Sequence, residues 1–439
     1  MKRLFQRREA LLGAALFVLL LAVYGGVYLL WLTGHEAAYL ALTRAWGIDT
    51  WYWPFLDLHG VLSWAECHRR GIDVLRTNPC DVLGRPLNYG PPLLYLPFGL
   101  RHTTILGLTQ SLLFLAALPF VLRPRTWRQW AVAAAASLST ATLFALERGN
   151  LDLSEFVLVA LGCAFAGRGV LGRLLAYTLY FLGGVVKFYP FVLLLLVLRE
   201  RIRLALALAA GFAVLIFCYA VHYWKALVAI AALMPKLSYE EDTFGATLLG
   251  FGLSDEFGWS RSFAIFISIL AFAAASAFAL WLASALRRGG RRLDFNDANM
   301  RHLLAGAVII ICCFVLQTNI TYRAIFLLFL LPGLAELRAD AGTKLVRRVF
   351  GWAIFALMFC LWSECLRRGL ESGLDAVAPD REDDSAWNNL LVAFFVGREI
   401  VWWSLMATTF SVILVFLRDC PLGAVVFSRL ARPRARPAA

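Results

Sequence analysis

The sequence predicts an all-α protein with many membrane-spanning helices, and three observations support this prediction. Hydrophobic residues make up 61% of the 439 residues and the mean hydropathy is +0.70, whereas globular proteins are about half apolar. Many apolar runs reach the roughly 20 residues that a helix needs to cross a bilayer. These runs are too long, and alternate too poorly, for the strands of a transmembrane barrel. We therefore expect one integral membrane domain over residues 1–439.

The apolar runs predict a bundle of about 10–12 transmembrane helices. The first follows the basic segment MKRLFQRR, and we expect it to be retained. Its apolar core is too long for a signal peptide, and no small-residue cleavage site follows it at the right distance. The expected spans lie at about residues 10–32, 103–122, 131–146, 152–166, 174–186, 189–198, 204–221, 262–286, 303–317, 322–337, 346–364 and 400–417.

The net charge of +13 follows the expected membrane topology. With the N-terminus inside, the inside segments hold 26 of the 42 Lys and Arg but only 7 of the 29 Asp and Glu, so the two sides carry +19 and −6. This asymmetry is the positive-inside rule, and it argues against a nucleic-acid partner. We expect a bacterial inner-membrane protein with both termini in the cytoplasm, a basic tail at about 418–439, and a functional site that faces the periplasm.

Residues 174–198 allow two interpretations. One long helix would leave the basic loop 199–203 outside, whereas a break at 187–190 (KFYP) makes two short half-helices and returns that loop to the inside. Broken membrane helices occur where they line a cavity. The positive-inside rule favours the break.

The nine cysteines show no CxxC pair and no His-rich spacing, so we expect no structural metal site and no cofactor. Most of them lie within the spans, where a free thiol behaves as a small apolar residue. Cys67 and Cys80 share the first outer loop, in a compartment that permits disulfides. Spacing alone leaves open whether they are bonded.

The first outer loop, about 34–101, carries the acid that we single out, Asp57. Acids in a membrane domain are functional candidates by default, and one at the boundary with water exchanges protons easily. Asp is also a favoured helix N-cap, and an amphipathic interfacial helix is expected over 58–70, so capping is the structural alternative. The preceding residues 51–53 (WYW) fit an aromatic belt at the interface.

Further candidates are polar side chains at the outer ends of the spans. Arg148, Lys187 and Arg323 lie in three different short turns or helix breaks. Arg148 is either a satisfied interfacial cation or a phosphate clamp, whereas Lys187 and Arg323 either snorkel to the surface or bind a ligand. Three cations from different helices would suit one phosphate group. Arg85 and Asn88, in the turn-rich segment 84–97, are candidates for contact with a phosphate or a sugar.

The order of these elements resembles a known enzyme class. After Asp57 and the interfacial helix come a G-x-D motif ending at Asp73, an Asn-Pro and a Tyr-x-Pro. A Gly-Asn turn at 149–150 and a K-x-x-P motif at 187–190 follow. The sequence over about 10–205 resembles the GT-C class of membrane glycosyltransferases, and most of all glycosyltransferase family 87.

The resemblance implies a mechanism and its substrates. It implies that Asp57 is the catalytic base of an inverting transfer from a polyprenyl-phosphate sugar to a glycan or lipid acceptor, without a metal ion. Residues 147–150 (ERGN) stand where the family usually shows Gly-Gln, and residues 321–323 (TYR) where a histidine is often found. The resemblance therefore does not specify mannose, the sugar that some members of the family transfer. Asp73 is carried over with the other substrate-binding candidates.

Two other functions are compatible with the sequence. A transporter or flippase of lipid-linked sugars would use outer acids and a broken helix, but the acids cluster on one face and no internal repeat is visible. A structural subunit of an envelope complex would need none of the candidate residues. We expect membrane lipids to surround the chain whichever of these functions it has.

Overall fold

The computed structural model describes residues 2–48, 50, 53–233, 242–288, 293–316, 318–377 and 385–430. Over these residues the protein is almost entirely helical, so the predicted fold class, an all-α polytopic membrane protein, is confirmed. The described β-structure is one antiparallel pairing of β1 (Thr243–Phe244) with β2 (Asn319–Ile320). Two predicted features, residues 51–52 of the aromatic belt and residues 431–439 of the basic tail, lie outside the described part.

Seventeen α-helices are described, together with four 3₁₀ segments, η1 to η4. Their bounds are α1 Lys2–Leu32, α2 Glu36–Ala45, α3 Leu56–Arg69, η1 Pro91–Tyr95, η2 Leu100–His102, α4 Thr103–Leu122, α5 Trp127–Ser137, α6 Thr140–Arg148, α7 Asp152–Phe165, α8 Gly169–Lys187, η3 Tyr189–Arg199, α9 Ile202–His222, α10 Trp224–Leu233, α11 Leu248–Phe257, α12 Arg261–Arg288, α13 Ala298–Leu316, η4 Thr321–Phe329, α14 Leu330–Ala339, α15 Lys344–Val377, α16 Ser385–Asp419 and α17 Pro421–Leu430.

Each expected span corresponds to a helix or a helix pair. Within the described residues, eight helices are long and apolar enough to cross a membrane, and α5 with α6 makes a ninth if that bent pair is one span. The other expected spans fall on the shorter segments α7, η3 and η4 with α14. α13 is mostly buried at the centre of the bundle, whereas α9 and α12 expose most of their apolar side chains at the periphery.

The expected break in 174–198 is confirmed. α8 ends at Lys187, Phe188 has a positive φ of 62°, and Pro190 follows at the start of η3. Proline lacks the N–H that would continue the helix, so the chain turns at this point. η3 then packs back against α8, which places the end of α8 beside the first outer loop.

The expected span 131–146 is also bent, which the sequence analysis did not predict. α5 and α6 meet at 48° across a short gap. Ser139 caps α6 by accepting a hydrogen bond from the Thr142 N–H, and this cap stabilises the start of a new helix. The bend brings the end of α6, which carries Glu147 and Arg148, to the first outer loop.

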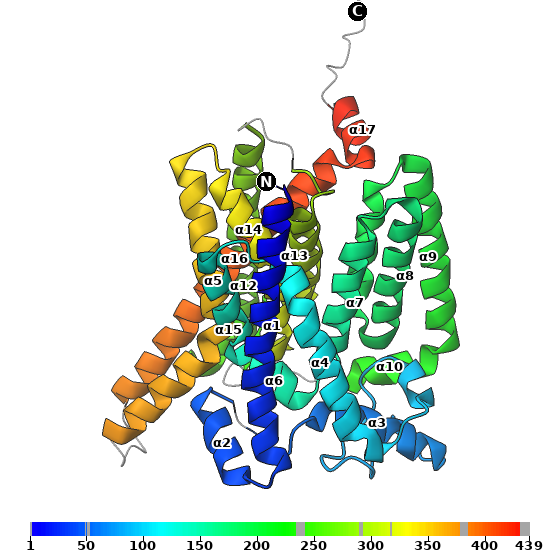
Figure 1. Ribbon diagram of the computed structural model, residues 1–439, viewed down its shortest axis with the longest axis vertical. Coiled ribbons are helices and arrows are strands. Elements are labelled where there is room, and N and C mark those ends of the chain that lie inside the picture. The colour runs from blue at the N-terminus through cyan, green and yellow to red at the C-terminus, as the bar shows by residue number, and fades with distance from the viewer. Residues whose placement is uncertain are drawn as a thin grey trace, which may run out of the picture.

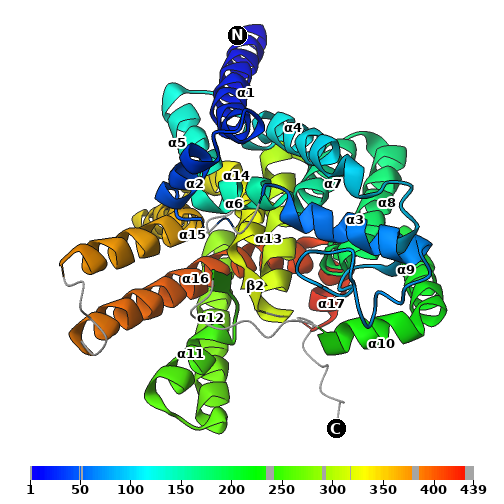
Figure 2. The same cartoon turned by 90° about the horizontal axis from the view of Figure 1, so that it is seen from below.

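The outer loop forms a compact layer at one end of the bundle. In Figure 1, α2, α3 and α10 lie at the lower end, while α17 and the start of α1 lie at the upper end. Figure 2 shows α3 crossing that lower end. The amphipathic prediction for this helix was wrong in part: α3 buries Ser63 as well as its apolar residues, because the segment after it folds back over it.

The membrane orientation is testable by cysteine labelling. Arg101, in η2 before α4, and Arg347, in the first turn of α15, are both exposed, and the expected topology places them on opposite sides of the membrane. We expect Arg101→Cys to react with a membrane-impermeant maleimide in intact spheroplasts, and Arg347→Cys to react only after permeabilisation, as the positive-inside rule requires. The unsubstituted chain gives the background labelling of the native cysteines. The reverse pattern would place α3 in the cytoplasm.

Candidate functional site

Asp57 is not the N-cap of its helix, so the capping interpretation was wrong. α3 begins at Leu56, and the cap position is Phe55, which makes no side-chain capping bond. Phe55 adopts a left-handed φ of 69°, and its N–H donates to the Glu147 carbonyl at 2.6 Å. This contact between the outer loop and α6 starts the helix earlier than the sequence indicated. The Asp57 carboxylate is therefore left to face the interior of the site.

Two donors hold the Asp57 carboxylate from opposite sides. Arg85 Nη1 donates to Oδ1 at 2.9 Å, and Asn150 Nδ2 donates to Oδ2 at 2.6 Å. The Asp57 side chain retains 17% exposure. Each carboxylate oxygen has a second lone pair, so both keep an acceptor site after these bonds are made.

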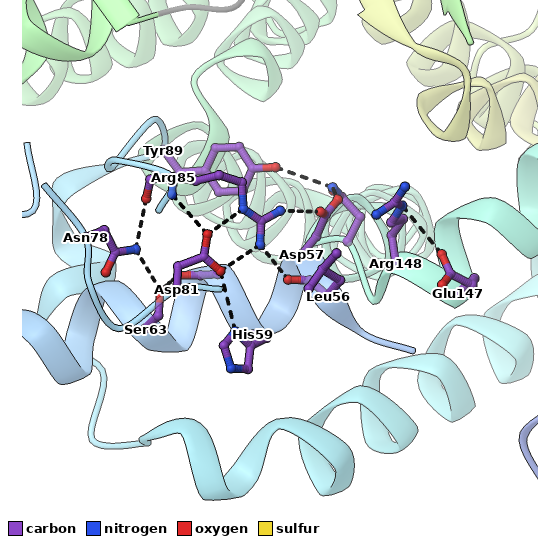
Figure 3. Close-up of polar contacts among 12 residues, drawn as sticks. Leu56, Asp57, His59, Ser63, Asn78, Asp81, Arg85, Tyr89, Glu147 and Arg148 are labelled. Carbon is purple, nitrogen blue, oxygen red and sulfur yellow. Dashed lines mark hydrogen bonds and ion pairs between the residues drawn. The ribbon is translucent and has the colours of Figure 1, made fainter. Parts of the chain in front are cut away.

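Arg85 is positioned by a second carboxylate, Asp81 (Figure 3). Arg85 Nε and Nη2 donate to Asp81 at 2.8 and 3.1 Å, and Nη2 also donates to the Leu56 carbonyl at 2.7 Å. Burial raises the pKa of Asp81, but His59 and Arg85 outweigh burial and hold this pKa well below its ordinary range. Asp81 thus compensates most of the Arg85 charge, and one guanidinium edge remains for Asp57.

The segment that carries Arg85 is tied to α3. Asn78 Nδ2 donates to Ser63 Oγ at 2.8 Å and to the Arg85 carbonyl at 2.9 Å. A disulfide joins Cys67 in α3 to Cys80, so the pairing that the sequence left open is present in the structure. The two links to the helix lie just before Asp81, and the bond from Asn78 to the Arg85 carbonyl closes the loop around Asp81.

On the other side of Asp57, Asn150 leads to a buried ion pair. Lys187 Nζ donates to Asn150 Oδ1 at 2.5 Å and to Asp152 Oδ1 at 2.7 Å, and it lies 4.5 Å from the centre of the Tyr89 ring. The Lys187 side chain is 0% exposed, so the snorkelling interpretation was wrong. Its three N–H groups are directed at an amide, a carboxylate and an aromatic face.

The Asp152 carboxylate interacts with two further side chains. Arg323 Nε lies 3.4 Å from Asp152 Oδ2, and Tyr189 donates a hydrogen bond to Oδ1. The polar contacts therefore form one chain that runs from Asp81 through Arg85, Asp57, Asn150, Lys187 and Asp152 to Arg323. It joins the outer loop, the α6–α7 turn, the end of α8 and η4.

Four members of this chain of contacts, Asp57, Arg85, Lys187 and Arg323, line one cavity of about 640 Å³, within the usual range for ligand sites. Of the residues predicted from the sequence, six line it: Asp57, Arg85, Asn88, Arg148, Lys187 and Arg323. The seventh, Asp73, does not line the cavity. Its side chain is 58% exposed and pairs with Arg76 at 3.5 Å on the surface of the loop, so its prediction as a substrate-binding residue is not supported by its position.

The cavity has a charged side and an apolar side. Arg148 lies against Glu147 on the charged side, with its Nε 3.5 Å from the carboxylate. The apolar side is lined by Phe191, Val192 and Leu316. Leu316 is 74% exposed and ends the apolar helix α13, so the apolar side of the cavity reaches the surface of the bundle.

Sequence reasoning missed the residues that organise the site. Asp81 was one of several acids in the loop, Asn150 was seen only as part of a turn, and Asp152 and Tyr189 were not singled out. Gly149 marks the end of α6, but this signal locates the turn and does not show what Asn150 contacts. Nothing in the sequence spacing distinguishes Asp81 from Asp73.

The arrangement suits proton transfer beside an anion. Asp57 can accept a proton from a bound hydroxyl, and the guanidinium groups of Arg148 and Arg323 can bind a phosphate. Among the described residues, no three His, Cys, Asp or Glu side chains are grouped so that they could hold a metal ion.

Removing the charge of Lys187 should destabilise the protein. Lys187→Met leaves Asp152 buried with Arg323 as its remaining cation, and breaking a buried pair on one side costs about 3–5 kcal/mol. We expect a clearly lower midpoint of thermal unfolding in detergent. Lys225→Met, at an exposed position in α10, is the control and should change stability by less than about 0.5 kcal/mol. Equal midpoints for the two variants would contradict a structural role for the pair.

The disulfide should stabilise the outer layer. Replacing both Cys67 and Cys80 by serine removes a cross-link over 13 residues, for which loop-closure entropy predicts a loss of roughly 3 kcal/mol. We expect a lower unfolding midpoint in detergent for this double variant. Mass spectrometry of non-reduced peptides checks the bond directly: separate, unlinked peptides from the native protein would contradict the pairing.

Comparison with known proteins gives no functional assignment, so a proposal for the function has to rest on the fold and this cavity. No family model, no curated protein and no solved structure matches the chain.

Proposed function

We propose that the protein is an inverting membrane glycosyltransferase that moves a sugar from a polyprenyl phosphate to an acceptor hydroxyl on the outer face, with Asp57 as the general base. The observation that carries this proposal is the composition of the cavity. One accessible carboxylate, a group of cations and an apolar wall that reaches the surface of the bundle line the same space. A lipid-linked sugar phosphate presents the matching groups.

The phosphate of the donor would bind to arginines. All three N–H groups of Lys187 are already directed at partners inside the protein, so its role is to fix the site. Arg148 and Arg323 line the cavity with guanidinium groups, which bind phosphate oxygens in a bidentate manner. The isoprenoid chain would leave along Phe191, Val192 and Leu316.

The proposed reaction balances with the groups at hand. The oxygen of the acceptor hydroxyl forms a bond to the anomeric carbon, the bond from that carbon to the phosphate oxygen breaks, and Asp57 takes the hydroxyl proton. Polyprenyl phosphate leaves with its charge stabilised by the arginines. A single displacement inverts the anomeric centre. Asp81 already compensates the positive charge of Arg85. Asp57 accepts one hydrogen bond from Arg85 and keeps a lone pair that can accept the proton.

The resemblance of residues 10–205 to GT-C glycosyltransferases supports the same reaction class. The proposed donor sugar is mannose or another hexose or pentose, and the proposed acceptor is a glycan or a lipid. The location is the outer side of a bacterial inner membrane, as the charge asymmetry of the loops favours.

The decisive test is Asp57→Asn in membranes supplied with radiolabelled polyprenyl-phosphate sugars. The substitution keeps the shape but removes the base, so we expect transfer to fall by about 10²–10⁴-fold, the usual contribution of a general base. Glu66→Gln is the matched control: it is an acid-to-amide change in the same helix, where Glu66 pairs with Arg69 and Arg70 on the surface. This control should retain activity.

Two results would overturn the proposal. Full transfer by Asp57→Asn would remove Asp57 from the role of base. Movement of the labelled lipid across liposomes by the purified protein, without a new glycosidic product, would instead favour a transporter or flippase.

A further inference from the structure

Asn150 occupies a position in which every polar atom of its side chain is used. It is completely buried and follows Gly149, which adopts the left-handed conformation with a φ of 57°. The turn between α6 and α7 is tight at this point, because a side chain on Gly149 would come within 2.9 Å of the Phe55 ring. The backbone of Asn150 is thereby fixed against α3.

The contacts determine which way the amide points. Asn150 Oδ1 accepts from Lys187 Nζ at 2.5 Å and from the Asp152 N–H at 3.0 Å. Both partners are donors, so the oxygen must face them. Nδ2 then faces acceptors: Asp57 Oδ2 at 2.6 Å and the Tyr89 hydroxyl at 3.4 Å. Rotating the amide by 180° would place N–H groups against donors and oxygen against a carboxylate.

Few other side chains would make these bonds from this place. An aspartate would keep the contacts of Oδ1 but would set a second carboxylate 2.6 Å from Asp57. A serine could accept from the Asp152 N–H, but its single oxygen could not make all four contacts. A glutamine has the same amide on a side chain that is one methylene longer, for which a site with no exposed surface has no room. An amide on a short side chain meets both demands.

We propose that Asn150 is the positioning residue of the candidate base: its amide, oriented by Lys187, fixes the position of the Asp57 carboxylate and connects it to the cations of the cavity. This inference rests on the proposed function. Because Asn150 binds one oxygen of the Asp57 carboxylate and Arg85 binds the other, the orientation of this carboxylate is fixed.

The charged and titratable groups that face Asp57 set what a pH measurement would report. They come from its own helix, the outer loop, α6, α8 and η4, and are His59, Asp81, Arg85, Tyr89, Glu147, Arg148, Lys187 and Tyr322. None of these groups changes in a substitution at position 150. A shift in the pH profile of such a variant therefore reports on residue 150 and the side chains that it contacts, Asp57, Lys187 and Tyr89.

The experiment compares Asn150→Asp with the native protein over a range of pH. Two carboxylates that share one site hold a proton more strongly than one does. We expect the acid limb of kcat to move up by at least about one pH unit, with kcat at neutral pH lowered about 10–100-fold and recovered in part at higher pH. The KM for the donor should stay within about twofold, because Arg148 and Arg323 are unchanged.

The matched control is Asn299→Asp. Asn299 is also buried, and its Nδ2 donates to a carboxylate, Glu336 Oε2, at 3.0 Å, but it lies in α13 away from the cavity. It introduces the same pair of carboxylates without touching Asp57. We expect its pH profile to match that of the native protein. A second variant, Asn150→Ser, removes the amide without adding charge and should lower kcat with little shift of the acid limb.

The outcomes separate this inference from the proposed function. If the native protein transfers sugar and Asn150→Asp has an unshifted profile, the inference is wrong and the proposed function stands. Failure of both Asn150 variants to accumulate as folded protein would make Asn150 a structural residue of the turn, which also overturns the inference. Absence of transfer by the native protein, with each polyprenyl-phosphate sugar tested, would count against the proposed function itself.

Discussion

The polar contacts of the cavity depend on the ion pair between Lys187 Nζ and Asp152 Oδ1, which are 2.7 Å apart and shielded from solvent. A lysine and an aspartate are each costly in an apolar bundle, and each is tolerated here because the other is present. The pair also fixes geometry. Lys187 orients the Asn150 amide, and through this amide a contact between α7 and α8 determines where the Asp57 carboxylate of α3 lies.

The ion pair exists because α8 is broken. The positive φ of Phe188 and the proline that follows end α8 at Lys187, so its ammonium points at the α6–α7 turn. The first outer loop approaches from the other side, where the Gly90 N–H donates to the carbonyl of Val186 one residue before Lys187. Asp57 therefore sits between two anchors: the Arg85–Asp81 pair in the loop and the Lys187–Asp152 pair in the bundle.

The sequence predicted the parts of this arrangement that depend on local chemistry. Hydropathy placed the spans, and the proline with the positive-inside rule placed the break at Lys187. The position of Asp57 in its helix was mispredicted, because that helix begins at a backbone contact between Phe55 and Glu147, which are far apart in the chain. Asp81 was not separated from Asp73 for a similar reason: both are acids in one turn-rich loop, and only the path of the chain brings one of them to Arg85.

The burial of Lys187 has a consequence for the chemistry that the cavity can support. A lysine in direct contact with the phosphate would bind substrate and product alike, and such uniform binding does not accelerate the reaction. Here its charge is balanced by Asp152, and the cations that we propose to bind a phosphate are Arg148 and Arg323, each of which also lies beside a carboxylate. A partly compensated guanidinium attracts a developing phosphate charge without holding the finished product tightly. In the proposed reaction, the same ion pair that makes the site rigid would therefore also lower the net positive charge that faces an anion.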